Sequence, residues 1–154
     1  MSHRHFIQLH WILDIVGLLP VSMEDGHEYK KNLSIIDIGI RWVELIPLHE
    51  RGRSISDIVD DYWLSRYPRP AIVLSDQGQK FKSWETDELL RSYGIKHHFT
   101  TTYSATGNSI IERSHGTINN MIRCLGVDNW HTELQSVAFA MRPTVHSSLG
   151  VTNN

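Results

Sequence analysis

Three acidic side chains stand at positions where a carboxylate can be held rigidly and still meet a substrate. Asp14 lies in the first predicted strand, Asp76 directly follows the short apolar segment "AIVLS", and Glu112 opens a long predicted helix. Carboxylate oxygens are the donors that hard cations such as Mg²⁺ and Mn²⁺ prefer. Two such ions, roughly 3.5–4 Å apart, can stabilise both the attacking and the leaving oxygen of a phosphodiester. The trio is therefore a candidate for metal-dependent phosphoryl transfer.

The same carboxylates also have an ordinary structural interpretation. The chain holds 17 acidic residues, so a chosen spacing between two of them arises by chance. An aspartate after a strand commonly forms a turn. Asp37 and Glu44 are the main competing carboxylates, and we expect both to be structural or solvated. Neighbouring His97 and His98 point to opposite faces of a predicted strand, which argues against a shared metal ion. On residue types and spacing alone, both interpretations stay open.

The elements that must position these side chains follow from hydrophobic periodicity and from helix caps. Strands are predicted at 8–16, 33–38, 41–48, 71–75 and 95–103, helices at 54–67, 83–94, 110–125 and 130–145, and a polar turn at 22–31. A meander of three antiparallel strands is followed by strands that alternate with helices, which predicts parallel pairing through right-handed crossovers. We therefore predict an α/β fold whose five-stranded mixed sheet is flanked by helices. If the first and fourth strands are neighbours, Asp14 and Asp76 can face one another.

Composition limits the class of protein without choosing a partner. The 154 residues, 40% hydrophobic and 21% charged, fit one globular domain with a real core. No signal peptide and no membrane span is recognised, so an intracellular location, nuclear or cytoplasmic, is expected. The single cysteine, Cys124, excludes an internal disulfide, and we expect it to be buried in a helix. The tryptophans at 11, 42, 63 and 84 are expected to pack in the core. A net charge of −2 favours no partner.

Several segments, in order along most of the chain, resemble the integrase catalytic core of gypsy-type long-terminal-repeat retrotransposons and retroviruses. They are "LDIVGLLPV", "IRWVELIPL", "YWLSRYPRPAIVLSDQGQKF", "YGIKHHFTTTYSATGNSIIERSHGTINNMIR" and "WHTELQSVAFAMRPTVHSSLG". The resemblance implies a ribonuclease H-like fold with two aspartates and a glutamate in the active site. In that family 35 residues typically separate the last two acids, and 35 residues lie between Asp76 and Glu112. The resemblance therefore selects Asp14, Asp76 and Glu112 as the catalytic and metal-binding residues.

The chemistry that this resemblance implies is DNA 3′-end processing followed by strand transfer, with two Mg²⁺ or Mn²⁺ ions as cofactors. The chain would be a polynucleotidyl transferase and endonuclease. Its partners would be the DNA ends of an element, a target duplex and further copies of itself, with no membrane and no small-molecule substrate. The candidate DNA contacts, which a solvated polar surface explains equally well, are Lys80, Asn108, Arg113, Asn119, Asn120 and Arg123.

The sequence also departs from the family pattern. Before Glu112, Ala105 stands near the usual proline and Ser109 at the usual glycine of the loop. We expect residues 1–154 to form a truncated core without the zinc-binding N-terminal and DNA-binding C-terminal domains of the family. Two alternatives remain: a catalytically inactive relict or domesticated nucleic-acid-binding domain, and another ribonuclease H-like transposase or nuclease.

Overall fold

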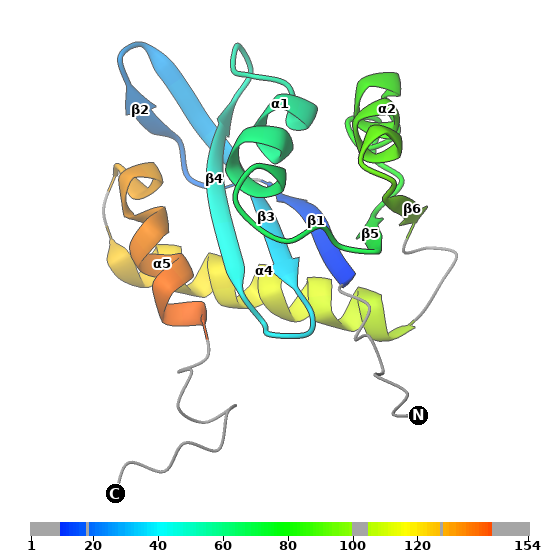
Figure 1. Ribbon diagram of the computed structural model, residues 1–154. Coiled ribbons are helices and arrows are strands. Elements are labelled where there is room, and N and C mark those ends of the chain that lie inside the picture. The colour runs from blue at the N-terminus through cyan, green and yellow to red at the C-terminus, as the bar shows by residue number, and fades with distance from the viewer. Residues whose placement is uncertain (1–9, 18, 100–104, 127, 143–154) are drawn as a thin grey trace, which may run out of the picture.

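The computed structural model describes residues 10–17, 19–99, 105–126 and 128–142, excluding the side chains of 105–108, 110 and 111 (Figure 1). Its strands are β1 (His10–Val16), β2 (Ser22–Glu24), β3 (His27–Asp37), β4 (Val43–His49), β5 (Ile72–Ser75) and β6 (Lys96–Phe99). Its helices are α1 (Ile55–Val59), the π-helix η1 (Asp60–Leu64), α2 (Trp84–Ser92), α4 (Ala105–Leu125), the 3₁₀-helix η2 (Trp130–Glu133) and α5 (Leu134–Met141). No helix among these residues is long and apolar enough to cross a membrane.

One mixed sheet holds all six strands, in the order β2-β3-β1-β5-β6, with β4 paired to β3. β1 and β4 run antiparallel to β3, whereas β5 is parallel to both β1 and β6. This arrangement confirms the predicted fold class, an antiparallel meander followed by parallel strands. β1 and β5 are neighbours, with Leu13 opposite Ser75. The next residues of the two strands are Asp14 and Asp76.

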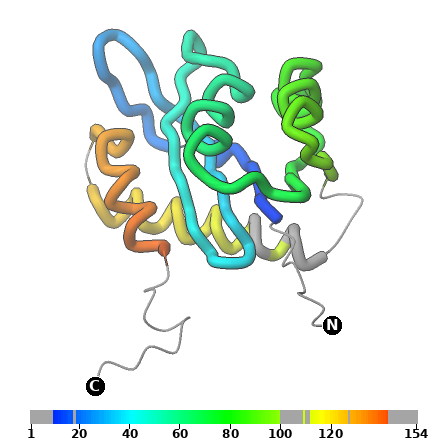
Figure 2. The backbone as a smooth tube through the Cα atoms, viewed as in Figure 1, coloured from blue at the N-terminus to red at the C-terminus, as the bar shows by residue number. Residues whose placement is uncertain are grey.

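Helices cover both faces of the sheet because side chains alternate along each strand. Trp11 and Leu13 belong to a buried cluster that includes side chains of α1, η1 and α2. Ile12 and Val16 face the other way and pack with Ile118 and Ile122 of α4 and with residues of η2 and α5. The smooth backbone trace in Figure 2 shows these layers, with α4 running across the sheet. Asp14 lies between Ile12 and Val16 in this alternation, so it is on the α4 face.

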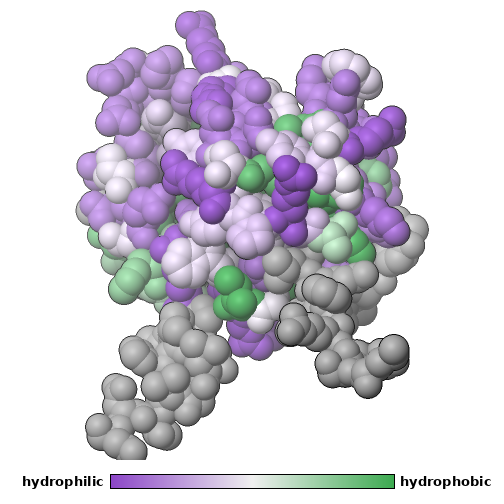
Figure 3. Space-filling view, viewed as in Figure 1, coloured by the Kyte–Doolittle hydropathy of each residue, from purple (hydrophilic) through white to green (hydrophobic). Residues whose placement is uncertain are grey.

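Residues 22–31 are not the simple polar turn that the sequence analysis predicts. They form β2 and the first half of β3, joined at Asp25 and Gly26, whose φ angles are 49° and 79°. Two consecutive positive φ angles are the conformation of a type I′ hairpin turn, and Asp-Gly is a preferred pair for it. The chain therefore continues as a two-stranded ribbon beyond the main sheet. In the space-filling view, polar side chains predominate on the visible face (Figure 3).

The competing carboxylates are structural, as expected. Asp37 accepts a hydrogen bond of 3.2 Å from the indole N–H of Trp11. Glu44 accepts hydrogen bonds of 2.9 Å from Trp42 and from Tyr67, and it forms a 3.1 Å ion pair with Arg142.

Two burial predictions are wrong. Trp84 is 73% exposed at the first position of α2, and Cys124 is exposed near the end of α4. Their apolar character predicts burial, but each lies on the outward side of an amphipathic helix.

Candidate active site

Asp14 is a carboxylate held inside the sheet-helix interface. Asp14 is only 3% exposed, and it pairs with Ser34 of β3. The Ser34 hydroxyl donates a 3.4 Å hydrogen bond to the Asp14 backbone carbonyl. The ladder with β3 includes Asp14 and the ladder with β5 ends at the preceding residue, Leu13, so the backbone at Asp14 has little freedom to move. The carboxylate is therefore fixed by the central strand of the fold.

Asp76 is the exposed partner at the carboxyl end of β5. The backbone N–H of Gly78 donates a 2.7 Å hydrogen bond to Asp76 Oδ1, which closes a tight turn. A Cβ at position 78 would lie 2.8 Å from the same oxygen, so any larger residue there would displace the Asp76 carboxylate from this position. On the other side of the strand end, Ser75 Oγ and His97 Nε2 share a hydrogen bond of 2.6 Å. The turn holds the Asp76 carboxylate, and a 3.1 Å hydrogen bond that the Ser75 hydroxyl donates to the Asp76 carbonyl holds its backbone.

His115 is a site residue that the sequence analysis missed. Its Nε2 contacts Asp14 Oδ2, so α4 reaches the central carboxylate through an imidazole. His115 follows Glu112 by three residues, and such residues are neighbours on a helix surface. A search for hydrogen-bonding side chains one turn from each candidate acid would have singled out the residue, although not its contact with Asp14.

Burial and charge act together on Asp14. Desolvation raises the pKa of Asp14 to about 6, the charge of His115 opposes the rise, and the nearby charge of Asp76 adds to it. A carboxylate that is both desolvated and close to a second carboxylate is stabilised by a nearby cation. In this structure the imidazole of His115 occupies that place beside Asp14.

Glu112 is not gathered with the two aspartates. It is exposed on α4. Over the part of the chain that the structure describes, no three His, Cys, Asp or Glu side chains come together in a group that could hold a metal ion. The structure thus places His115 in contact with Asp14 and Asp76 near enough for its charge to act on Asp14, and it leaves Glu112 one helical turn from His115 along α4.

The candidate DNA contacts fall into separate places. Asn119 and Arg123 follow Glu112 by seven and eleven residues, so the three lie on one stripe of α4. Arg113 and Asn120 are exposed farther round the helix, and Arg113 Nε donates a 3.3 Å hydrogen bond to the Ser109 carbonyl. The side chain of Asn108 lies outside the described residues. Lys80 lines a cavity of about 530 Å³ between the β2–β3 ribbon and the end of β4.

The donors at the strand ends fit a hard divalent cation. Asp14 and Asp76 offer oxygen ligands, and Asp76 is open to solvent. Burial, the chief cause of the raised pKa of Asp14, and the neighbouring charge of Asp76 both favour a positive charge beside the two carboxylates. Glu112 lies on α4, one turn before His115, and is the next acid to consider as a ligand.

Comparison with known proteins decides the family. The integrase core domain family matches residues 8–105 of this chain, which include both aspartates. The chain belongs to the integrase core domain family. It is also 26% identical over 137 residues to the retrovirus-related Pol polyprotein from transposon 412 of Drosophila melanogaster, covering 86% of this chain. A stretch of 59 residues is 34% identical to the Gag-Pro-Pol polyprotein of human T-cell leukemia virus 2, covering 38% of this chain.

The fold agrees with this membership. The integrase catalytic core domain of HTLV-2, solved in complex with magnesium in a trimeric form, superimposes with a TM-score of 0.56 at 20% sequence identity. The match covers 87% of this chain and 82% of the HTLV-2 chain. The integrase core thus belongs to a family of polynucleotidyl transferases of retroviral and retrotransposon type. The chain spans only 11% of the transposon 412 polyprotein and 4% of the viral polyprotein.

Proposed function

We propose that this integrase core catalyses divalent-metal-dependent DNA 3′-end processing and strand transfer, with Asp14, Asp76 and Glu112 as its metal-binding and catalytic residues. The substrates are the DNA ends of a mobile element and a target duplex, and the working form is a homo-oligomer. The observation that carries the proposal is the nearness of a buried aspartate within β1, in contact with α4, to an exposed aspartate at the end of the neighbouring strand β5.

Each protein group has a part in this chemistry. Asp14 and Asp76 present oxygen donors from two neighbouring strands, so their separation is set by the sheet. Glu112 supplies the third carboxylate from α4 after the helix turn that carries it moves toward Asp14 and Asp76. Mg²⁺ or Mn²⁺, when bound, activates the attacking oxygen and stabilises the leaving one. His115 holds the Asp14 carboxylate toward α4, and the stripe of Asn119 and Arg123 offers polar contacts to DNA beside Glu112.

The magnesium-bound HTLV-2 core supports the choice of cofactor, since that relative shares the fold. The sequence spacing supports Glu112 as the third acid, with 35 residues between it and Asp76. The position of Glu112 in the structure requires α4 or the side chain to move toward the aspartates before three carboxylates can act together.

A branched-DNA resolution assay tests the proposal, because it needs only the core and a preassembled DNA junction. Wild-type protein with Mg²⁺ or Mn²⁺ is expected to resolve the junction, releasing the element end and rejoining the target strand, and Asp76→Asn and Glu112→Gln are expected to abolish this product. Asp128→Asn and Glu85→Gln, matched changes at exposed acids outside the site, should leave the product unchanged. Folded wild-type protein without any product would instead support the catalytically inactive nucleic-acid-binding domain.

A further inference from the structure

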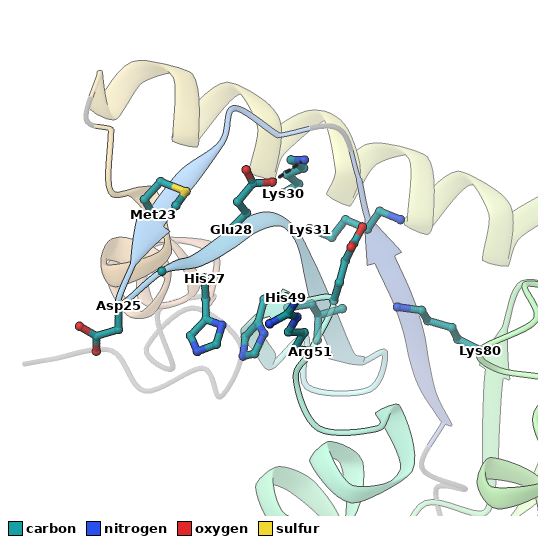
Figure 4. A pocket seen from close by; sticks show the side chains of 12 residues that line it. Met23, Asp25, His27, Glu28, Lys30, Lys31, His49, Arg51 and Lys80 are labelled. Atoms are coloured by element: carbon teal, nitrogen blue, oxygen red, sulfur yellow. Dashed lines mark ion pairs between the residues drawn. The ribbon is translucent and has the colours of Figure 1, made fainter.

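A second feature lies at the same edge of the sheet as the two aspartates. Figure 4 shows the cavity between the β2–β3 ribbon and the end of β4, with side chains of both elements pointing into it. Its lining includes four cations, Lys30, Lys31, Arg51 and Lys80, against three carboxylates. The whole chain is slightly acidic, at a net charge of −2, so this gathering of cations is local.

The carboxylates of the cavity do not neutralise all of its cations. Glu28 forms a 2.7 Å ion pair with Lys30. A hydrogen bond from Lys30 to Glu28 raises the pKa of that lysine, with smaller contributions from the charges of Glu28 and Glu50. Asp25 stands at the turn of the ribbon, at the opposite end of the cavity from Lys80 (Figure 4). Two of the three acids therefore act on Lys30.

The remaining cations are Lys31, Arg51 and Lys80, and none of them forms an ion pair with another described residue. In Figure 4, Lys31 and Lys80 occupy the end of the cavity next to β1. Exposed ammonium and guanidinium groups without carboxylate partners suit the phosphates of a nucleic acid.

The chain connects these cations directly to the aspartates. Lys80 follows Asp76 by four residues, in the connection between β5 and α2. The Lys31 side chain packs along Gly17, three residues beyond Asp14, where a Cβ would lie 3.7 Å from the Lys31 Cε. Asp14 faces α4, whereas Leu48, which lines the cavity, belongs to the buried cluster on the opposite face of the sheet. A DNA strand that crosses this edge would therefore pass from the carboxylates to the cations.

We propose that the cavity between the β2–β3 ribbon and β4 binds the phosphate backbone of the DNA strand that continues from the active site, through Lys31, Arg51 and Lys80. This inference rests on the proposed function for the place of the reacting phosphate. It adds a binding surface formed by the ribbon, away from the α4 stripe.

Salt-dependent DNA binding tests the surface without requiring catalysis. The affinity for a fluorescein-labelled branched DNA is measured by anisotropy over a KCl series in EDTA. Wild-type protein is compared with Lys31→Gln/Arg51→Gln/Lys80→Gln. A matched triple, Arg66→Gln/Arg91→Gln/Lys96→Gln, removes the same charge from exposed positions outside the cavity. Each lost phosphate contact lowers the slope of log K against log[salt] by about 0.9 on duplex DNA.

For the cavity variant, the slope of log K against log[salt] is expected to fall by the amount that two to three phosphate contacts contribute. The variant is also expected to bind DNA at least about tenfold more weakly at low salt. The matched triple should keep the wild-type slope. Equal slopes for wild type and the cavity variant, equal losses in both triples, or wild-type protein that does not bind DNA would overturn the proposal. If the triple variant does not fold, Lys80→Gln alone, at an exposed turn, should lower the slope by about one contact, and an unchanged slope would count against the surface.

The outcome is separable from that of the catalytic proposal. Binding in EDTA does not use the metal site, so a slope that depends on the cavity supports this surface even if no product of junction resolution forms. Product that is lost in Asp76→Asn, together with an unchanged slope in the cavity variant, would keep the catalytic proposal and reject the surface.

Discussion

Burial of the ionised Asp14 carboxylate destabilises the folded protein, so the candidate active site affects the stability of the fold. The folded protein holds the Asp14 proton to a pKa of about 6, above the ordinary value of 3.8, chiefly because the carboxyl is desolvated. Between these two values the folded state binds more protons than the unfolded state. The free energy of unfolding therefore falls as the pH rises through this window, and the stabilisation by the neutral carboxyl is lost above pH 6.

Asp14→Asn should remove this dependence because an amide does not titrate. Without metal ions, we expect the variant to be more stable than wild type at pH 7, by on the order of 1–3 kcal/mol, and to lack the decline between about pH 4 and 6. Urea unfolding in EDTA from pH 4 to 7.5 measures both effects, with Asp128→Asn as the exposed control. A variant that is less stable than wild type at pH 7 would show that Asp14 is not strained in the metal-free protein.

For the individual residues, the sequence predicts part of the site. The pairing of Asp14 with Asp76 follows from two strand ends that topology makes neighbours. The contact of His115 with Asp14 does not follow from the sequence, because it depends on how α4 crosses the sheet. The exposure of Glu112 depends on the same packing.

Among the elements, the β2–β3 ribbon is the one that shapes the DNA-binding cavity, and a buried histidine anchors it to the C-terminal helices. His131 Nδ1 shares a 2.5 Å hydrogen bond with Ser22 Oγ, and His131 Nε2 donates a 3.0 Å hydrogen bond to Glu24. The imidazole also stacks on Tyr29, with ring centroids 4.5 Å apart. The ribbon is thus held by η2.

His131→Ala should loosen this ribbon. It leaves the fully buried Ser22 hydroxyl without its partner and opens a space beside Tyr29, which we expect to cost about 2–3 kcal/mol of unfolding free energy. Urea denaturation gives the cost, and hydrogen exchange should show faster exchange at residues 22–31. Gln135→Ala, at an exposed position of α5, is the control. Unchanged exchange in the ribbon would mean that the β2–β3 ladder alone maintains it.

The ribbon also shows why sequence patterns fail for some elements. The first five residues of β3 are exposed or half-buried, so they lack the apolar alternation by which strands are recognised. The Asp25-Gly26 pair was the available signal, since it favours a two-residue hairpin turn. Ser54 and Ser83, in contrast, cap α1 and α2 at the first residues of the helices predicted at 54–67 and 83–94, because a cap depends only on local sequence.

In the molecule as a whole, an acidic and a basic region lie at one edge of the sheet, and the small net charge does not reveal them. Asp14 lies on the α4 face of the sheet near Asp76, and Lys31, Arg51 and Lys80, which form no ion pair with another described residue, line the cavity. A metal ion beside the aspartates and phosphates along the cations would satisfy both regions together. The fold class was predictable because strand order and alternation determine it, whereas this distribution of charge required the folded chain.

The central claim is that Asp14, Asp76 and Glu112 bind the same divalent cation site, and Mn²⁺ titration calorimetry on the purified protein tests it most directly. We expect wild type to bind Mn²⁺, Asp14→Asn and Asp76→Asn to lose binding, and Glu112→Gln to bind at least tenfold more weakly, roughly 1.4 kcal/mol. Glu85→Gln, on the opposite helical layer, should bind as wild type does. Wild-type affinity in Glu112→Gln would remove that residue from the site, and wild-type affinity in both aspartate variants would contradict the account.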